Sequence, residues 1–265
     1  MDVKDSMVVV TGGGAGIGAA LVDLLVAEGA AGILVSDRDL SAAEQVAARH
    51  AGGAARVIAR QADMTSGEDI DRLVAFAERT FGHIDILCSN AGIMTTGGVE
   101  LPAGDWDLAW RINLMAHVHA ARAALPLMVR RGRGHFVNIV SAAGMLTAPG
   151  AGPYSVTKHA AVGLAEWMAI TYGDQGIGVS LVCPGAVQTG MLAASLADGN
   201  EGVRRVAATS AVLDAVSVAR AIVEGVIADR FLITPHEDTL PNTQRKWNDP
   251  DRWIRGMRAF LRTTA

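Results

Sequence analysis

Residues 7–18 read Met7-Val-Val-Val-Thr11-Gly12-Gly-Gly14-Ala-Gly16-Ile17-Gly18, and this stretch decides the fold. Its apolar, β-branched start predicts a strand buried on both faces. The glycines predict a tight turn, and a helix is expected from about Ile17 to Gly29. A strand, a glycine turn and a helix in this order let a pyrophosphate approach the backbone at the helix N-terminus. A plain flexible turn is the alternative, against which the flanking elements argue. The candidate cofactor-binding residues here are Gly12, Gly14, Gly16, Ile17 and Gly18.

The second predicted strand, residues 32–37, ends on an acidic residue. Asp37 lies 21 residues after Gly16, about the distance at which such folds hold the adenosine ribose hydroxyls with a carboxylate. A cap on the strand end is the alternative for this side chain. Arg38 beside it could accommodate a 2′-phosphate instead. We therefore expect NAD as the cofactor, with NADP as the open alternative.

Strands and helices continue to alternate along the chain. Further strands are predicted at 56–61, 84–89, 135–141, 178–183 and 231–234, and helices at 41–50, 66–81, 105–130, 153–172 and 217–228. The helix at 105–130 is expected to be interrupted near Pro126. No linker or internal repeat divides the chain, so the pattern predicts a single α/β domain over residues 1–265. Its sheet would be mostly parallel, doubly wound and of Rossmann type, with helices on both faces.

The tail from about residue 236 to 265 has no role that the sequence assigns. Within it, Ile254, Met257 and Leu261 stand at helical spacing, with arginines on the opposite side. This predicts a helix over 249–261 that docks near the substrate region or on a neighbouring subunit.

Composition and charge exclude several functions for the 265 residues. The net charge of -4 gives no electrostatic footprint for nucleic acid. Two charge-free runs, 135–157 and 175–197, contain prolines and polar residues, so they read as strands and loops rather than membrane spans. The N-terminus resembles no signal peptide, which predicts a cytoplasmic protein. Cys88 and Cys183 fall in strand-like runs and are expected as buried free thiols, without a metal site.

The segment Tyr154-Ser-Val-Thr-Lys158 carries candidate chemistry. A Tyr and a Lys four residues apart share one face of a helix. An ammonium favours the neighbouring phenolate, so the pair is a candidate proton donor and acceptor. The same spacing occurs on ordinary amphipathic helices, and only the other motifs favour a catalytic role.

Six motifs in order resemble the short-chain dehydrogenase/reductase family, in its form of roughly 250 residues. They are Thr11-Gly-x-x-x-Gly16-x-Gly18, Asn90-Ala91-Gly92, Asn113, Ser141, Tyr154-x-x-x-Lys158 and Pro184-Gly185. The resemblance covers about residues 5–235. It implies a sheet of about seven parallel strands, usually in a homotetramer, with a nicotinamide cofactor across the carboxyl ends of the strands.

The resemblance also implies roles for individual residues. Tyr154 would be the general acid/base, and Lys158 would lower its pKa and hold the nicotinamide ribose. Ser141 would donate to the substrate oxygen, and Asn113 would support a water that leads protons from Lys158. Asp63 and Met64 would flank the adenine. The other cofactor-binding candidates are Asn90, Ala91, Gly92, Tyr154, Lys158, Pro184, Gly185, Val187 and Thr189.

The expected activity is hydride transfer between NAD(H) and a small-molecule secondary alcohol or ketone. Loops after three strands supply apolar side chains with almost no charge, which predicts a mainly apolar substrate. Candidate substrate contacts are Met94, Ser141, Met145, Tyr154 and Met191. Three alternatives stay open: a non-catalytic NAD(P)-binding regulator, an NADP-dependent ketone reductase, and a nucleotide-sugar epimerase or dehydratase, for which the chain leaves little room.

Overall fold

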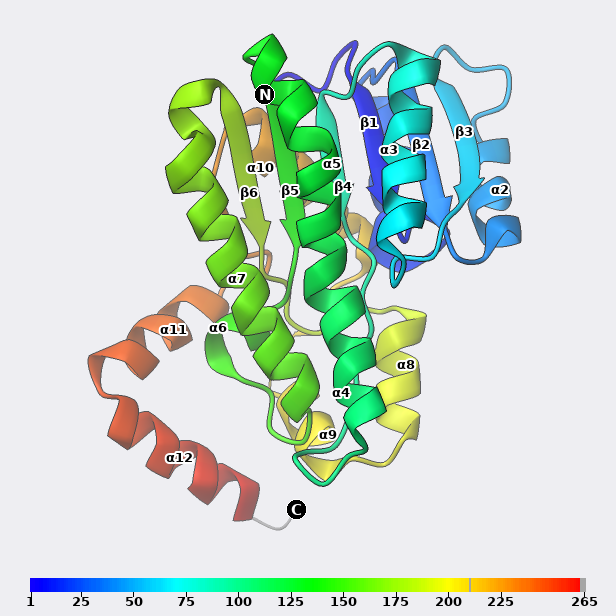
Figure 1. Ribbon diagram of the computed structural model, residues 1–265. Coiled ribbons are helices and arrows are strands. Elements are labelled where there is room, and N and C mark those ends of the chain that lie inside the picture. Colours follow the sequence, from blue (N-terminus) through cyan, green and yellow to red (C-terminus); the bar gives the residue numbers. More distant parts are fainter. Residues whose placement is uncertain (210, 263–265) are drawn as a thin grey trace.

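The computed structural model of the protein describes residues 1–209 and 211–262, and its centre is a parallel sheet (Figure 1). The seven strands lie in the order β3-β2-β1-β4-β5-β6-β7, and every pairing is parallel. Their bounds are β1 Met7–Thr11, β2 Gly32–Asp37, β3 Arg56–Gln61, β4 Ile86–Ser89, β5 Gly134–Ile139, β6 Ile177–Val182 and β7 Leu232–Ile233. The strand order reverses beside β1, so the sheet is doubly wound and of Rossmann type, as predicted.

Helices cover both faces of this sheet. Their bounds are α1 Gly16–Ala27, α2 Leu40–Ala48, α3 Gly67–Phe81, α4 Ala103–Trp110, α5 Ala116–Arg131, α6 Ala143–Leu146, α7 Gly152–Tyr172, α8 Gly190–Ala197, α9 Glu201–Ala207, α10 Ala215–Ile227, α11 Thr239–Asn248 and α12 Pro250–Arg262. In Figure 1, α3, α5 and α7 lie in front of the strands and α10 lies behind them.

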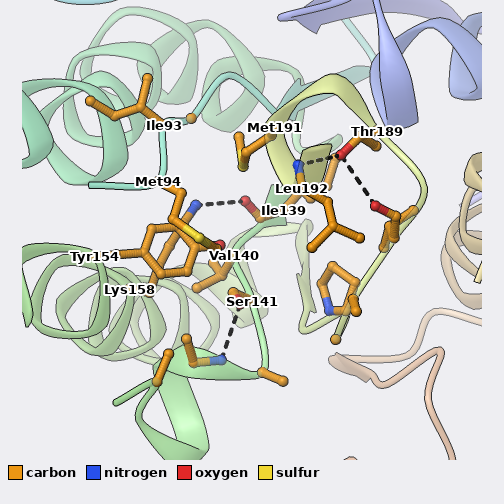
Figure 2. Close-up of a pocket in the computed structure, with 18 of the residues that line it drawn as sticks. Ile93, Met94, Ile139, Val140, Ser141, Tyr154, Lys158, Thr189, Met191 and Leu192 are labelled. Atoms are coloured by element: carbon orange, nitrogen blue, oxygen red, sulfur yellow. Dashed lines mark hydrogen bonds between the residues drawn. The ribbon is translucent and has the colours of Figure 1, made fainter. Parts of the chain in front are cut away.

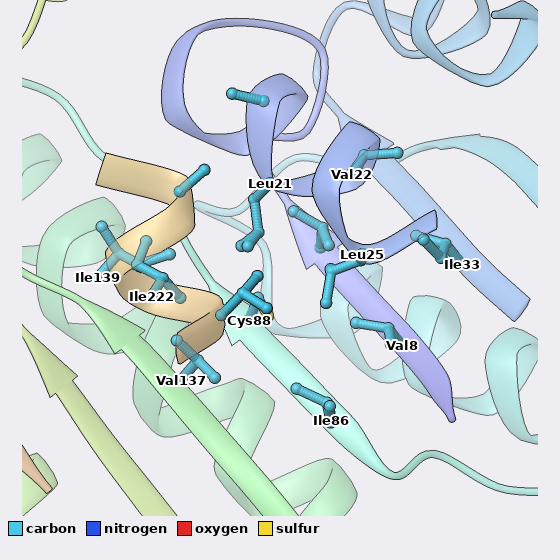
Figure 3. Packing of buried hydrophobic residues seen from close by; sticks show 14 of the residues in the cluster. Val8, Leu21, Val22, Leu25, Ile33, Ile86, Cys88, Val137, Ile139 and Ile222 are labelled. Carbon is cyan, nitrogen blue, oxygen red and sulfur yellow. The ribbon is translucent and has the colours of Figure 1, made fainter. Parts of the chain in front are cut away.

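Each face of the sheet has its own core, because successive strand residues point to opposite sides. Val8 and Val10 of β1 pack on the face covered by α1, α2 and α10, whereas Val9 packs on the face covered by α3, α5 and α7. Figure 3 shows the first core, which contains Leu21 of α1 and Ile222 of α10. Burial on both faces explains why β1, β4 and β6 are mainly apolar, whereas the edge strand β3 is partly exposed and contains Arg56, Arg60 and Gln61.

The expected interruption of the helix at 105–130 lies elsewhere than predicted. α5 runs through Pro126 without a break. The break comes earlier, in the π-helical turn η1 over Arg111–Met115 between α4 and α5. A π-turn inserts one extra residue and is frequent at functional sites. The prediction at Pro126 was therefore wrong, and the irregular turn contains the candidate residue Asn113.

The C-terminal tail forms two helices that lie away from the sheet. α11 follows β7, and α12 continues from it toward α9 (Figure 1). Lys246 of α11 donates to the carbonyl of Met145 at 2.7 Å, and Arg205 of α9 donates to the carbonyl of Phe260 at 3.2 Å. These two bonds tie the end of α11 and the C-terminal part of α12 to the body of the protein. None of the helices over 1–209 and 211–262 is long and apolar enough to span a bilayer.

Candidate active site

A cavity of about 720 Å³ lies at the carboxyl ends of the strands. In an open parallel sheet, ligands bind at this edge beside the point where the strand order reverses. The cavity is lined by residues that follow β1, β2, β3, β4, β5 and β6, and by residues of α8, α9, α11 and α12. It therefore spans most of the sheet and continues under the tail.

The glycine turn after β1 leaves the N-terminus of α1 open toward the cavity. Gly12 and Gly16 have positive φ angles, which favour glycine. The helix begins after Ala15, whose methyl side chain cannot cap the free backbone N–H groups, and its first turn contains no acid. Gly16 and Ile17 line the cavity. Free N–H groups and the helix dipole suit a pyrophosphate at this position.

Gly14 and Gly18 support the turn without lining the cavity. The N–H of Gly14 donates to the Asp37 carboxylate at 3.0 Å, and a Cβ on Gly14 would come within 2.9 Å of the same oxygen. A Cβ on Gly18 would overlap the carbonyl oxygen of Gly12 and come within 2.6 Å of Asn90 Nδ2. Both positions require glycine because the backbone is packed against them.

Asn90 fastens the glycine turn to the loop after β4. Its Nδ2 donates to the carbonyls of Thr11 and Gly12, each at 2.9 Å. The backbone N–H groups of Asn90 and Ala91 donate in return to Thr11 Oγ1. The two loops thus form one cavity wall, which explains why the predicted Asn90-Ala91-Gly92 motif accompanies the glycines.

Ser141, Tyr154 and Lys158 converge at the floor of the cavity (Figure 2). Ser141 follows β5, while Tyr154 and Lys158 lie one turn apart on α7. All three are buried, and Lys158 Nζ lies 3.5 Å from the carbonyl oxygen of Ile139 and 5.7 Å from the centroid of the Tyr154 ring. Gly92 keeps room for the ammonium, since a Cβ there would lie 3.3 Å from Nζ.

Burial is the main cause of the pKa shifts of Tyr154 and Lys158. It raises the pKa of Tyr154 above its ordinary value, and the hydrogen bond from Ser141 acts in the opposite direction. Burial also lowers the pKa of Lys158 to about 8. Desolvation of the phenolate outweighs the hydrogen bond from Ser141, so the pKa of Tyr154 lies above its ordinary value, and a lowering by Lys158 stays a prediction.

Asn113 is fully buried and does not line the cavity. Its Oδ1 accepts from the N–H of Ile93 at 2.9 Å, and its Nδ2 donates to the carbonyl of Ile93 and to Thr157 Oγ1. Both donor hydrogens of the amide are used in these bonds. The side chain thus joins η1, the loop after β4 and α7, the three segments that surround Lys158.

Most of the remaining predicted residues line the cavity. These are Asp37, Asp63, Met64, Asn90, Ala91, Gly92, Met94, Pro184, Gly185, Val187, Thr189 and Met191. Met145 is the exception, because its side chain packs against the core under α7. Its neighbour Leu146 lines the cavity instead, since adjacent residues of the short helix α6 point in different directions.

The tail lines the cavity, which is one of the two docking positions that the sequence left open for it. Trp253, Met257 and Phe260 of α12 line the cavity, together with Asp238, Thr239 and Asn242 at the start of α11. The sequence had placed Ile254, Met257 and Leu261 on one helix face. Met257 does line the cavity, but the other two cavity residues each lie one position earlier, and Ile254 is 55% exposed. The signal was present as the 253, 257, 260 spacing, which also fits one helix face. Among residues 1–209 and 211–262, no cluster of His, Cys, Asp and Glu is arranged to hold a metal ion.

Fold and site together define a Rossmann-type α/β protein with a deep cavity across the carboxyl ends of its strands. The chain belongs to the short-chain dehydrogenase family of oxidoreductases, whose family model matches residues 6–200. This confirms the resemblance that the six motifs indicated.

Two of the relatives carry dehydrogenase names. The chain is 38% identical over 191 residues to 2-(S)-hydroxypropyl-CoM dehydrogenase 3 of Xanthobacter autotrophicus, covering 71% of this chain and 74% of that one. It is 31% identical over 258 residues to 1-deoxy-11-beta-hydroxypentalenate dehydrogenase of Streptomyces exfoliatus, covering 96% and 91%. A short-chain dehydrogenase/reductase of Burkholderia phymatum, solved in complex with NAD, superposes with a TM-score of 0.86 at 28% identity, covering 95% of this chain and 96% of the other.

Proposed function

We propose that the protein transfers a hydride between NAD(H) and a mainly apolar secondary alcohol or ketone. The observation that carries the proposal is the convergence of Ser141, Tyr154 and Lys158 at the floor of a cavity with apolar walls. The bound cofactor supplies the hydride chemistry. The protein supplies binding, orientation and the proton.

In the direction of reduction, Tyr154 donates its phenolic proton to the carbonyl oxygen. Burial raises the pKa of Tyr154, so the phenol carries the proton that this step transfers. Ser141 donates a hydrogen bond to the same oxygen, where negative charge develops. Lys158 would hold the nicotinamide ribose. Asn113 acts as a positioning residue, because its amide holds the loop and helix on either side of Lys158.

A spectrophotometric screen tests the proposal. The purified protein is mixed with NADH or NADPH and a panel of ketones, and with NAD or NADP and the matching alcohols. Oxidation or reduction of the nicotinamide with at least one apolar pair is expected. Tight NADH binding without turnover of any pair would leave the non-catalytic regulator as the better interpretation.

NAD is proposed as the preferred cofactor because Asp37 is held in place at the cavity edge. Its carboxylate accepts from the N–H groups of Gly14 and Asp39, at 3.0 and 3.1 Å. A fixed carboxylate can accept from a ribose hydroxyl and repels a 2′-phosphate. Arg38 also lines the cavity, and it is the group that could favour NADP.

Replacing Asp37 with Asn is expected to raise NADPH affinity by at least ~10-fold, since like charges in contact near a surface repel by several kcal/mol. NADH affinity should fall or stay unchanged. Titration calorimetry with both cofactors measures the change. Asp39→Asn is the matched control, because it removes a carboxylate charge two residues away from Asp37. The Asp39 side chain caps α2, a role that Asn can also fill. A wild-type preference for NADPH would mean that Arg38 outweighs Asp37.

The walls of the substrate region support an apolar ligand. Met94, Leu146, Met191 and Leu192 line the same cavity as the catalytic group, and Figure 2 shows Met94 beside the Tyr154 ring. α12 closes the other side with Trp253, Met257 and Phe260, the only partly buried residues among the described part of that helix. We propose that the tail is the outer wall of the substrate region of its own subunit.

Trp253→Ala is expected to lower kcat/KM for a bulky ketone such as 2-decalone by roughly 10- to 100-fold. This loss corresponds to the free energy gained when a large apolar group is buried. Reduction of cyclohexanone, which is too small to reach the outer wall, should change far less. Ile254→Ala, on the exposed side of the same helix, serves as the control. Equal losses for both ketones would exclude a wall formed by Trp253.

A further inference from the structure

His236 lies directly after β7 and is only 4% exposed. Its ring makes two hydrogen bonds to the loop after β6. The backbone N–H of Gly185 donates to Nδ1 at 3.0 Å, and Nε2 lies 3.0 Å from the carbonyl oxygen of Ala186. An N–H can donate only to an unprotonated ring nitrogen, so the geometry assigns the neutral tautomer with its proton on Nε2.

The imidazole lies in close contact with the loop that it binds. A Cβ on Gly185 would come within 3.0 Å of His236 Cδ2, so glycine is required for the ring to approach this closely. Ala186 O also accepts from the N–H of Leu213, and Pro184 O accepts from the N–H of Ala142, next to Ser141. The loop is thus fixed between the catalytic segment on one side and His236 on the other.

This loop lies at one end of the cavity. Asp37 is the last residue of β2, whereas Pro184, Gly185 and Ala186 follow β6, and four strand spacings separate β2 from β6 in the sheet. At a strand spacing of nearly 5 Å this is roughly 19 Å, which suits an extended dinucleotide. With its adenosine at Asp37, such a ligand has its reactive half beside Ser141 and the loop.

We propose that His236 is a positioning residue that fixes residues 184–186 as the backing of the nicotinamide half of the cofactor. This inference rests on the proposed NAD(H) function, and nothing in the sequence pattern had assigned a role to His236. Its two hydrogen bonds hold the loop in the shape that meets the nicotinamide. Removing them should weaken contacts to that half of the cofactor and leave the adenosine half unaffected.

The test compares NADH with AMP as ligands in titration calorimetry. His236→Phe fills the same space without either hydrogen bond and is expected to raise the Kd of NADH by roughly 10-fold. The Kd of AMP should stay within about 2-fold of the wild type, because AMP reaches only the Asp37 end. His236→Asn keeps an acceptor for the Gly185 N–H and should lose less NADH affinity than the Phe variant.

The outcomes are separable. Equal weakening of NADH and AMP, or an unchanged NADH affinity, would overturn the role of His236 while leaving the proposed function in place. A wild-type protein that binds neither NADH nor NADPH would overturn both. Should the Phe variant fail to fold, as judged by circular dichroism, the same NADH-to-AMP comparison is made with His236→Asn, for which a selective loss of NADH affinity is expected.

Discussion

Tyr154→Phe is expected to lower turnover by at least ~10²-fold, the usual loss when a general acid/base is removed. Phenylalanine keeps the ring in its buried site and removes only the hydroxyl that donates to the substrate oxygen. The ammonium of Lys158 stays in place, so the Kd of NADH should change little. Steady-state rates with the best ketone from the screen, together with calorimetry of NADH binding, measure the two effects.

The chain offers a matched control in its second tyrosine. Tyr172 lies at the other end of α7, where its ring packs edge-on against Trp167. Tyr172→Phe makes the same chemical change on the same helix and should leave turnover unchanged. If Tyr154→Phe retained near-normal turnover, another residue would have to supply the proton, and the assignment of the catalytic group would be lost.

Gly18→Ala is expected to destabilise the protein by at least about 3 kcal/mol, the upper part of the range for overpacking. The added methyl group would overlap the carbonyl of Gly12 and press on Asn90, both of which belong to the packed turn between β1 and α1. These neighbours are backbone or hydrogen-bonded groups that cannot rotate away. A fall in Tm of roughly 6–10 °C should follow, with loss of measurable NADH binding.

Gly163→Ala is the control for this substitution. Gly163 lies on the exposed side of α7, and a Cβ there would meet no heavy atom within 4 Å. Alanine in a helix interior is better than glycine by about 0.5–1 kcal/mol, so this variant should be slightly stabilised. A Gly18→Ala protein as stable as the wild type would show that the turn is looser than the packing indicates.

The fold was predictable because its signals are local and repeated. A parallel strand that is buried on both faces is an apolar run. The turn after it can be located because a helix with a periodic apolar pattern follows. The strand at 32–37 and the helix capped by Ser66 are therefore where the sequence predicted them. The cofactor candidates after the strands followed from the same regularity.

The remainder depends on interactions between distant segments. Pro126 was an obvious place for a break, yet α5 continues through it. The helix is irregular instead at the π-turn that contains Asn113, whose amide forms hydrogen bonds to two other segments. The direction of the Tyr154 pKa depends on burial, which no motif encodes. Which face of α12 turns inward is decided by α9 and α11, far from it in sequence. Homotetramer assembly and a cytoplasmic location stay predictions.

The placement of the tail suggests how this enzyme class can diversify. The family model ends at residue 200, while the outer wall of the cavity comes from residues after 236. A recombination event that exchanged the last thirty or so residues would alter the shape offered to substrates and leave the sheet intact. His236 would mark the boundary of such an exchange: a crossover on its C-terminal side preserves the bonds to Gly185 and Ala186, whereas one before it would disturb cofactor and substrate regions together.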